Sequence, residues 1–172
     1  MSLRSILIHP DARLRKKCEL VVNFDSKLEN LTQDMLETMY DAPGIGLAAP
    51  QIGVMLQVFV MDCALKDERP NPLILINPSI LWHSEETSVH SEGCLSIPEQ
   101  YEEVTRPKSV KVSFQNVKGV VSEISFEGIE ATCSQHEIDH LNGKLFIDYL
   151  SNLKKKMITD KMKKLKRELA RK

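Results

Sequence analysis

Apolar residues recur at helical spacing in three stretches of the chain. From Ser26 to Asp41 they fall every three or four positions, which predicts an amphipathic helix that ends before Pro43 and Gly44. Residues 129–141 form a second predicted helix, because Asn142–Gly143 favours a left-handed stop. A third helix is predicted from about residue 150. Its expected apolar stripe consists of Leu153, Met157, Met162, Leu165 and Leu169.

Between the first two helices the pattern changes to that of β-strands. Residues 54–62 have a pattern that predicts a strand, and residues 73–77 form a short apolar strand that we expect Pro78 to end. Residues 104–114 and 120–127 are rich in β-forming side chains, and residues 116–119 predict a hairpin turn between them. The order predicts an α+β fold: mainly antiparallel sheets around a central helix, with an N-terminal helix and a C-terminal basic helix.

Length and composition fit a single domain, since 172 residues with 42% apolar content can build one core. The net charge of −1 argues against a dedicated nucleic-acid binder. That charge is unevenly distributed, because residues 151–172 hold ten Lys and Arg against Asp160 and Glu168, a balance of +8. Subtracting +8 from −1 leaves −9 on residues 1–150. The basic segment therefore predicts an electrostatic role.

Neither a secretory signal nor a membrane span is predicted. The apolar run at Ile6, Leu7 and Ile8 is too short for a signal peptide, and no stretch approaches the length of a transmembrane helix. The four cysteines contain no CxxC pair. We therefore expect a soluble cytoplasmic protein whose thiols pack in the core or bind a metal rather than form disulfides.

The strongest chemical signal is the H-E-x-x-H motif from His136 to His140. On a helix its two histidines lie one turn apart on one face, so both imidazoles can reach one metal ion. Glu137, beside the first histidine, is placed to act as a general base on a water molecule at that ion. The alternative is an exposed helix that carries these residues on its polar face.

A hydrolytic metal site usually has three protein ligands and one open position. Asp148 and Asp160 are the candidates downstream of the motif. Cys94 lies upstream, in the segment Glu92–Gly93–Cys94–Leu95–Ser96–Ile97–Pro98, where Gly93 allows close approach of the backbone. Cys94 is the better candidate, although a free cysteine on its own is more often a packing residue.

Residues 44–53 form a third cluster, rich in glycine and other small residues. The cluster lacks the Lys–Ser/Thr of a phosphate-binding loop and the spacing of a dinucleotide fingerprint. It allows a ligand to approach the backbone closely, and the amide of Gln51 can donate a hydrogen bond to a developing oxyanion. A plain connection between a helix and a strand is the alternative.

Taken together, the segments 44–53, 92–98 and 136–143 closely resemble the three signature segments of peptide deformylases. Their order and separations are similar, and the resemblance extends over nearly the whole chain, including residues 76–78 and 144–150. It implies removal of the N-formyl group from formylmethionine at the start of newly made polypeptides, with release of formate. Residues 1–150 would be the catalytic domain and residues 151–172 its basic helical extension.

The resemblance also implies a role for each matching residue. Cys94, His136 and His140 would hold one divalent metal ion, with Fe²⁺ expected and Zn²⁺, Ni²⁺ or Co²⁺ able to replace it. Glu137 would be the general base and acid, and Gln51 with the backbone N–H of Leu95 would stabilise the oxyanion. The substrate-binding residues would be Ile45, Gly46, Gly93, His90, Ile129, Thr132 and Cys133.

Within that substrate site, His90 and Thr132 stand where many family members carry aliphatic residues. We therefore expect a more polar methionine pocket. The resemblance further implies formylated nascent peptides as substrates and the ribosome as a partner of the C-terminal helix. We expect a monomer that binds neither a membrane nor a specific nucleic-acid sequence.

Two other functions remain open from the residues alone. A zinc endopeptidase would take its third ligand downstream and cleave internal peptide bonds. A non-catalytic, metal-bearing module at the ribosome would fill the fourth position, for example with Cys18 or Cys63. Glu137 and Gln51 favour the enzyme, because neither is needed to hold a metal.

Overall fold

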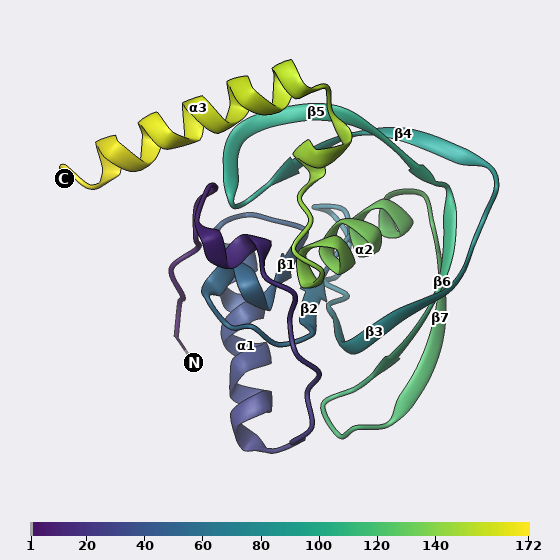
Figure 1. Cartoon of the computed structure of the whole chain (residues 1–172). Coiled ribbons are helices and arrows are strands. Elements are labelled where there is room, and N and C mark those ends of the chain that lie inside the picture. The colour runs from purple at the N-terminus through teal and green to yellow at the C-terminus, as the bar shows by residue number, and fades with distance from the viewer. Residues whose placement is uncertain (1) are drawn as a thin grey trace.

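A computed structural model describes residues 2–172 as an α+β fold with mainly antiparallel sheets (Figure 1), which confirms the predicted class. The helices are α1 (Ser26–Asp41), α2 (Gly128–Leu141) and α3 (Asn152–Leu169), with short 3-10 turns η1 (Ala12–Arg15), η2 (Ala49–Ile52) and η3 (Phe146–Tyr149). The strands are β1 (Gly46–Ala48), β2 (Val58–Met61), β3 (Leu73–His83), β4 (Thr87–Cys94), β5 (Ile97–Pro107), β6 (Ser109–Gln115) and β7 (Val121–Glu127).

Five strands form one sheet in the order β1-β2-β3-β6-β7, and β4 pairs with β5 as a separate ribbon. Strand β2 is buried on both faces because α1 and α2 cover opposite sides of it. Val58 and Val60 pack in the cluster with α1, whereas Phe59 and Met61 pack in the cluster with α2. This alternation places α2 at the centre of the molecule, between the sheet and the ribbon (Figure 1).

Local signals account well for α1 and α2. The Asp25 side chain caps the start of α1 by accepting a hydrogen bond from the Leu28 N–H at 3.1 Å, and the helix has the predicted bounds. Helix α2 ends at the predicted stop, where Gly143 has a φ of +74°. A side chain at Gly143 would also meet the Arg15 carbonyl at 2.4 Å, so both dihedral and space require glycine.

Three predicted strands have different bounds in the structure, the first being residues 54–62, of which only Val58–Met61 form strand β2. Strand β3 continues through Pro78 to His83, because a register shift between Ile76 and Ser79 takes up the proline and Asn77, whose φ is +50°. Residues 104–114 form parts of two strands, since the chain turns at Lys108 from β5 of the ribbon to β6 of the main sheet. The predicted hairpin between β6 and β7 is confirmed.

Helix α3 follows the outside of the molecule, and its C-terminal end projects beyond the body (Figure 1). The predicted apolar stripe is only partly right. Ile158 and Met162 are buried with Leu14 and Phe146, and Leu165 is partly buried beside them. The other predicted members of the stripe are exposed: Leu153, Met157 and Leu169. Within residues 2–172, no helix combines the length and apolar character needed to cross a membrane.

Candidate metal centre

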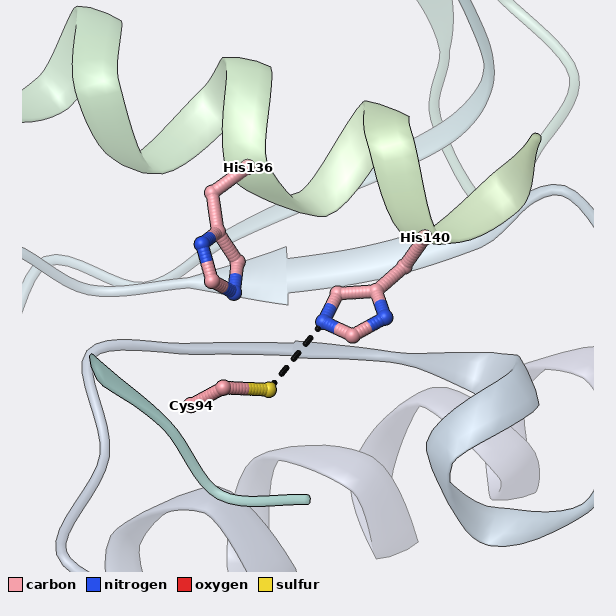
Figure 2. Close-up of side chains that lie close together, drawn as sticks. All are labelled: Cys94, His136 and His140. Carbon is pink, nitrogen blue, oxygen red and sulfur yellow. Dashed lines mark hydrogen bonds between the residues drawn. The ribbon is translucent and has the colours of Figure 1, made fainter. Parts of the chain in front are cut away.

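Both histidines and the glutamate of the H-E-x-x-H motif are buried on α2. Most of this helix is covered, by the main sheet on one side and by the β4–β5 ribbon on the other. His136 and Glu137 line a cavity between these layers, and the His140 imidazole lies one turn beyond His136 (Figure 2). The alternative of an exposed polar helix is therefore excluded.

Cys94 reaches the same point from the end of β4. Figure 2 shows its thiol below the two imidazoles, and its Sγ lies 3.3 Å from His140 Nε2. Cys94, His136 and His140 each place one potential ligand atom here, and the three atoms lie within 4.8 Å of one another. Ligands at about 2.3 Å (sulfur) and 2.0–2.1 Å (nitrogen) from a tetrahedral ion are roughly 3.5 Å apart, so the spacing and the donor set fit a divalent metal.

The remaining candidate ligands lie elsewhere. Asp148 is paired with Arg15 at 2.6 Å and with Lys155 at 2.7 Å, and Asp160 is paired with Lys156 on the exposed face of α3. Neither Cys18 nor Cys63 belongs to the group formed by the three residues. The upstream cysteine is therefore the residue that the fold brings to the motif.

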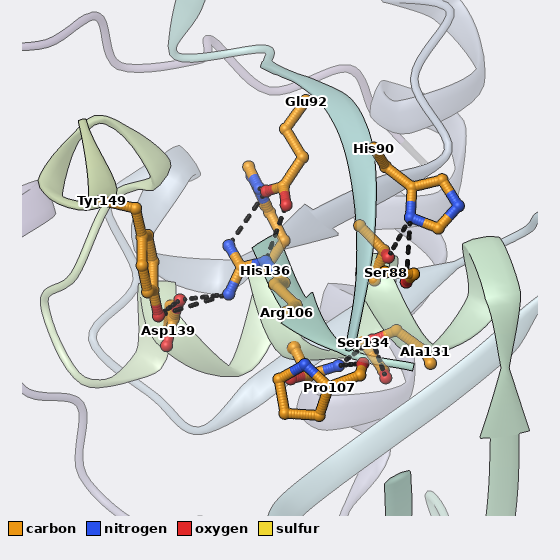
Figure 3. A network of polar contacts seen from close by, with 12 residues as sticks. Ser88, His90, Glu92, Arg106, Pro107, Ala131, Ser134, His136, Asp139 and Tyr149 are labelled. Atoms are coloured by element: carbon orange, nitrogen blue, oxygen red, sulfur yellow. Dashed lines mark hydrogen bonds and ion pairs between the residues drawn. The ribbon is translucent and has the colours of Figure 1, made fainter. Parts of the chain in front are cut away.

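The buried ion pair of Glu92 and Arg106 orients the His136 ring (Figure 3). Its Nδ1 lies 2.9 Å from Glu92 Oε1, leaving Nε2 for the Cys94 side. Arg106 donates to both Glu92 oxygens, at 2.7 and 2.9 Å, and both side chains are at most 5% exposed. Burial alone lowers the pKa of His136, but the Cys94 and Glu92 contacts outweigh it and raise that pKa well above its usual value.

Arg106 also ties α2 to the segment that follows it. Its Nη1 donates to Asp139 Oδ2 at 2.8 Å, and its guanidinium lies over the Tyr149 ring at 4.6 Å (Figure 3). Tyr149 in turn donates to Asp139 at 2.8 Å. This network was not predicted from the sequence. A signal was present, because Arg106 lies two residues from buried Val104 and therefore on the covered face of β5.

The carboxyl group of Glu137 is only partly satisfied within the protein, as is the His140 ring, whose Nδ1 also has no partner among the described residues. Its Oε2 is buried without a hydrogen-bond partner among the described residues, and burial raises the pKa of Glu137 to about 7. A side chain at Gly46 would meet Glu137 Oε1 at 2.5 Å, so glycine at this position of β1 leaves room for the carboxyl group. A carboxyl group with such a pKa can both accept and donate a proton near neutral pH.

His140 has the opposite shift. Burial, aided by the neighbouring positive charges, lowers its pKa well below the usual value, which keeps the imidazole neutral. Neutral imidazole is the form that binds a metal, and at His136 the ion would take the place of the proton that the Cys94 and Glu92 contacts favour.

Gln51 is held with its amide nitrogen toward the thiol. Its Oε1 accepts from the Ala48 N–H at 2.9 Å, and its Nε2 donates to Ser96 Oγ at 3.1 Å and to Cys94 Sγ at 3.4 Å. These contacts assign the orientation of the amide, since the oxygen faces a backbone donor. The side chain is thus fixed with its donor in the cavity.

The cavity measures about 480 Å³ and is bounded by all three of the segments that the sequence analysis singled out. The predicted site residues on its wall are Ile45, Gly46, Gln51, Gly93, Cys94, Leu95, Ile129, Thr132, Cys133, His136 and Glu137. His90 is not among the lining residues; it lies beside Thr132, with Nδ1 2.9 Å from the threonine hydroxyl.

Comparison with known proteins gives a consistent result. The family model of polypeptide deformylases matches residues 3–156. A peptide deformylase from Bartonella henselae is 51% identical over 148 residues, covering 86% of this chain and 84% of the relative. One from Afipia carboxidovorans is 53% identical over 148 residues, with 86% of each covered.

Solved structures agree with these relatives. The crystal structure of a peptide deformylase from Legionella pneumophila has a TM-score of 0.91 and 46% identity, with 99% of each chain covered. That of a peptide deformylase from Ehrlichia chaffeensis in complex with actinonin has a TM-score of 0.93 and 39% identity, with 97% of this chain and 99% of the other covered.

Proposed function

This chain belongs to the polypeptide deformylase family, and on that basis we propose how its own residues perform the reaction. It is a hydrolase that removes the N-formyl group from formylmethionyl peptides. We assign the metal to Cys94, His136 and His140, proton transfer to Glu137, and oxyanion stabilisation to Gln51 and the Leu95 N–H. The single observation that carries this assignment is the convergence of the thiol and two imidazoles, with Cys94 and His136 on the cavity wall and His140 beside them.

The substrate would enter in extended form beside β1. This strand is the edge of the five-stranded sheet, paired on one side with β2, and Ile45 and Gly46 lie on the cavity wall. A peptide added along such an edge is recognised mainly through its backbone, which suits an enzyme that must accept many sequences after the first residue. The first side chain would then lie against Ile129, Thr132 and Cys133 of α2, and Gly93 would face the backbone.

A divalent ion at this site would supply Lewis acidity, which polarises a carbonyl group and lowers the pKa of water. Glu137 would take a proton from the attacking water and deliver it to the leaving nitrogen, a double role that its raised pKa allows. In place of its long contact with Cys94 Sγ, Gln51 Nε2 would donate a hydrogen bond to the developing oxyanion together with the Leu95 N–H. The products would be formate and a peptide with a free amino terminus.

We assign Fe²⁺ as the ion, with Zn²⁺, Ni²⁺ or Co²⁺ able to replace it. One thiolate and two neutral imidazoles suit each of these borderline ions. Four free cysteines accord with a reducing compartment, and we propose that the protein acts in the cytoplasm as a monomer.

A pair of cysteine variants tests the metal assignment. Cys94→Ala should bind Zn²⁺ or Co²⁺ far more weakly than the unaltered protein, because one of three ligands is lost. Cys63→Ala is the matched control and should keep full metal content, since Cys63 lies outside the group. Metal content after dialysis, with the Co²⁺ absorption spectrum, provides the readout. Unchanged metal affinity in Cys94→Ala would overturn the assignment.

We further propose that residues 151–172, as an extension of a catalytic domain formed by residues 1–150, dock on the ribosome. The segment carries a charge of +8, and α3 exposes most of its lysines. Neutralising Lys163, Lys164 and Arg167 should weaken co-sedimentation with ribosomes and reduce its salt dependence by about one unit of slope per lost phosphate contact. Hydrolysis of a formylated tripeptide should not change. An unaltered salt slope would mean that this helix is only solvated surface.

A further inference from the structure

One face of α2 forms a continuous wall of the cavity. Ile129, Thr132, Cys133, His136 and Glu137 all line it, at the spacing of successive helical turns. Thr132 lies four residues before His136, which corresponds to about 6 Å along the helix. If the formyl group of the substrate lies at His136, the side chain of the first residue therefore extends to the level of Thr132.

Thr132, a residue of this wall, carries a hydroxyl group that faces His90. The residue is 3% exposed, and its Oγ1 lies 2.9 Å from Nδ1 of His90 on β4. Ser88 Oγ lies 3.5 Å from the same nitrogen (Figure 3). A hydroxyl group has one donor and two acceptor positions. When Nδ1 carries the proton, His90 donates to Thr132, and the hydroxyl proton is left for a group in the cavity.

The neighbours of Thr132 on the wall do not duplicate this donor. Ile129 is apolar, and Cys133 Sγ is directed to the Ile45 carbonyl at 3.6 Å. The nearby Cys63 thiol and burial raise the pKa of Cys133 well above its usual value, so this thiol stays neutral. Ser134 on the same stretch of α2 does not line the cavity and donates its hydroxyl proton to the Ala131 carbonyl, so Thr132 is the hydroxyl-bearing residue of α2 on the wall.

We propose that Thr132 is a specificity-determining residue that donates a hydrogen bond to an acceptor atom at the thioether position of the first side chain. His90 acts as its positioning residue. Substrates with sulfur or a sulfoxide oxygen there, methionine and methionine sulfoxide, are favoured over norleucine, which has the same shape without an acceptor. This inference rests on the substrate placement of the proposed function.

The test compares formyl-Met-Ala-Ser with the norleucine and methionine-sulfoxide analogues. In Thr132→Val, which keeps the shape and removes the hydroxyl, the methionine-to-norleucine ratio of kcat/KM should fall by about twofold to tenfold, the range of one net hydrogen bond. The sulfoxide ratio should fall further, because its oxygen is the stronger acceptor. The loss should appear in KM for the methionine peptide, since the contact is not made by reacting atoms.

Variants of His90 separate positioning from packing. His90→Leu should lower the same ratio, whereas His90→Asn, which can still donate to Thr132, should restore most of it. Thr105→Val is the matched control on an exposed position of β5 and should keep the ratio of the unaltered enzyme. Dissociation constants of the three peptides for Glu137→Gln should show the same order without turnover.

The outcomes are distinguishable from failure of the proposed function. If the unaltered enzyme releases no formate from any of the peptides, the proposed function itself is wrong. If it hydrolyses all three but Thr132→Val keeps the original ratios in kcat/KM and in binding, the Thr132 assignment is overturned. If His90→Asn behaves as His90→Leu does, the positioning role of His90 is overturned.

Discussion

Helices α2 and α3 are both rich in polar residues, yet they are placed in opposite environments. Ten of the fourteen residues of α2 are buried, including His136, Glu137 and His140, whereas α3 buries Ile158 and Met162 out of eighteen. Polar groups on α2 must therefore find partners within the protein, and those on α3 are solvated. The contrast between the two helices shows that burial, more than residue type, decides which polar side chains take part in chemistry.

The same contrast holds for the ion pairs. The Arg106–Glu92 pair is nearly inaccessible and orients His136, while the Lys156–Asp160 pair on α3 is more than half exposed on both sides. An exposed pair contributes about 0–1 kcal/mol, whereas removing one partner of a buried pair costs about 3–5 kcal/mol. Substitutions of buried polar residues on or beside α2 should therefore have larger effects on activity and stability than matched substitutions on α3.

The largest difference in activity is expected between substitutions of Glu137 on α2 and Glu168 on α3. Glu137→Gln should lower the rate of formate release by about 10²–10⁴-fold or more, because one carboxyl group serves in two proton transfers. Metal content should remain, since the carboxyl group is not assigned as a ligand. Glu168→Gln on the exposed end of α3 is the control and should leave the rate unchanged. Rate and metal content should be measured on one sample. A fully active Glu137→Gln would remove the residue from its proposed role.

The next largest effect is a difference in stability between substitutions of buried Arg106 and exposed Arg171. Arg106→Leu leaves Glu92 buried without its charge partner and should lower the free energy of unfolding by about 3–5 kcal/mol. It should also weaken metal binding, because the Glu92 carboxyl group that orients His136 is no longer held. Arg171→Leu in the exposed C-terminal turn should change stability by less than about 0.5 kcal/mol. Denaturant unfolding measures both, and equal stability of the two variants would contradict the contrast.

The smallest effect concerns how α3 is attached. His9 Nε2 lies 2.9 Å from Thr159 Oγ1 on α3, and burial, with the Arg15 charge, lowers the pKa of His9 to about 4. The folded-state pKa is below the unfolded value of 6.5, so the unfolded chain binds the proton first as the pH falls. Stability should therefore be lost between pH 6.5 and about 4, by up to about 3 kcal/mol.

The His9→Leu variant isolates that contribution. The difference between its unfolding free energy and that of the unaltered protein should change over this pH window and stay constant above it. Because other histidines titrate equally in both proteins, their contributions cancel in the difference. A difference that does not depend on pH would rule out His9 as the titrating group.

Local sequence signals predicted those parts of the molecule that local physics determines. The bounds of α1 and the stop after α2 follow from Asp25, Asn142 and Gly143, and the spacing of the histidines follows from the helical repeat. Cys94 was preferred as the third ligand from its residue type and its flanking glycine, and the family resemblance supported that choice, because no local pattern links it to histidines more than forty positions away.

The predictions that were wrong or missing concern features that depend on tertiary contacts. Pro78 was expected to end a strand, but a register shift lets β3 pass through it. The buried face of α3 depends on where Phe146 and Leu14 lie, so Ile158 was missed and Leu153 was wrongly placed on the stripe. The Glu92–Arg106 pair joins two strands of a ribbon and could be inferred only once their pairing was known.

The most direct test of the central claim is formate release under anaerobic conditions by protein loaded with Fe²⁺. Formyl-Met-Ala-Ser should be hydrolysed far faster than acetyl-Met-Ala-Ser, because membership of the deformylase family implies a tight formyl site, and His136 and His140 beside it are at most 8% exposed. A longer formylated peptide should lose formate and remain otherwise intact. Equal turnover of the acetylated peptide, or cleavage of an internal peptide bond, would contradict the account.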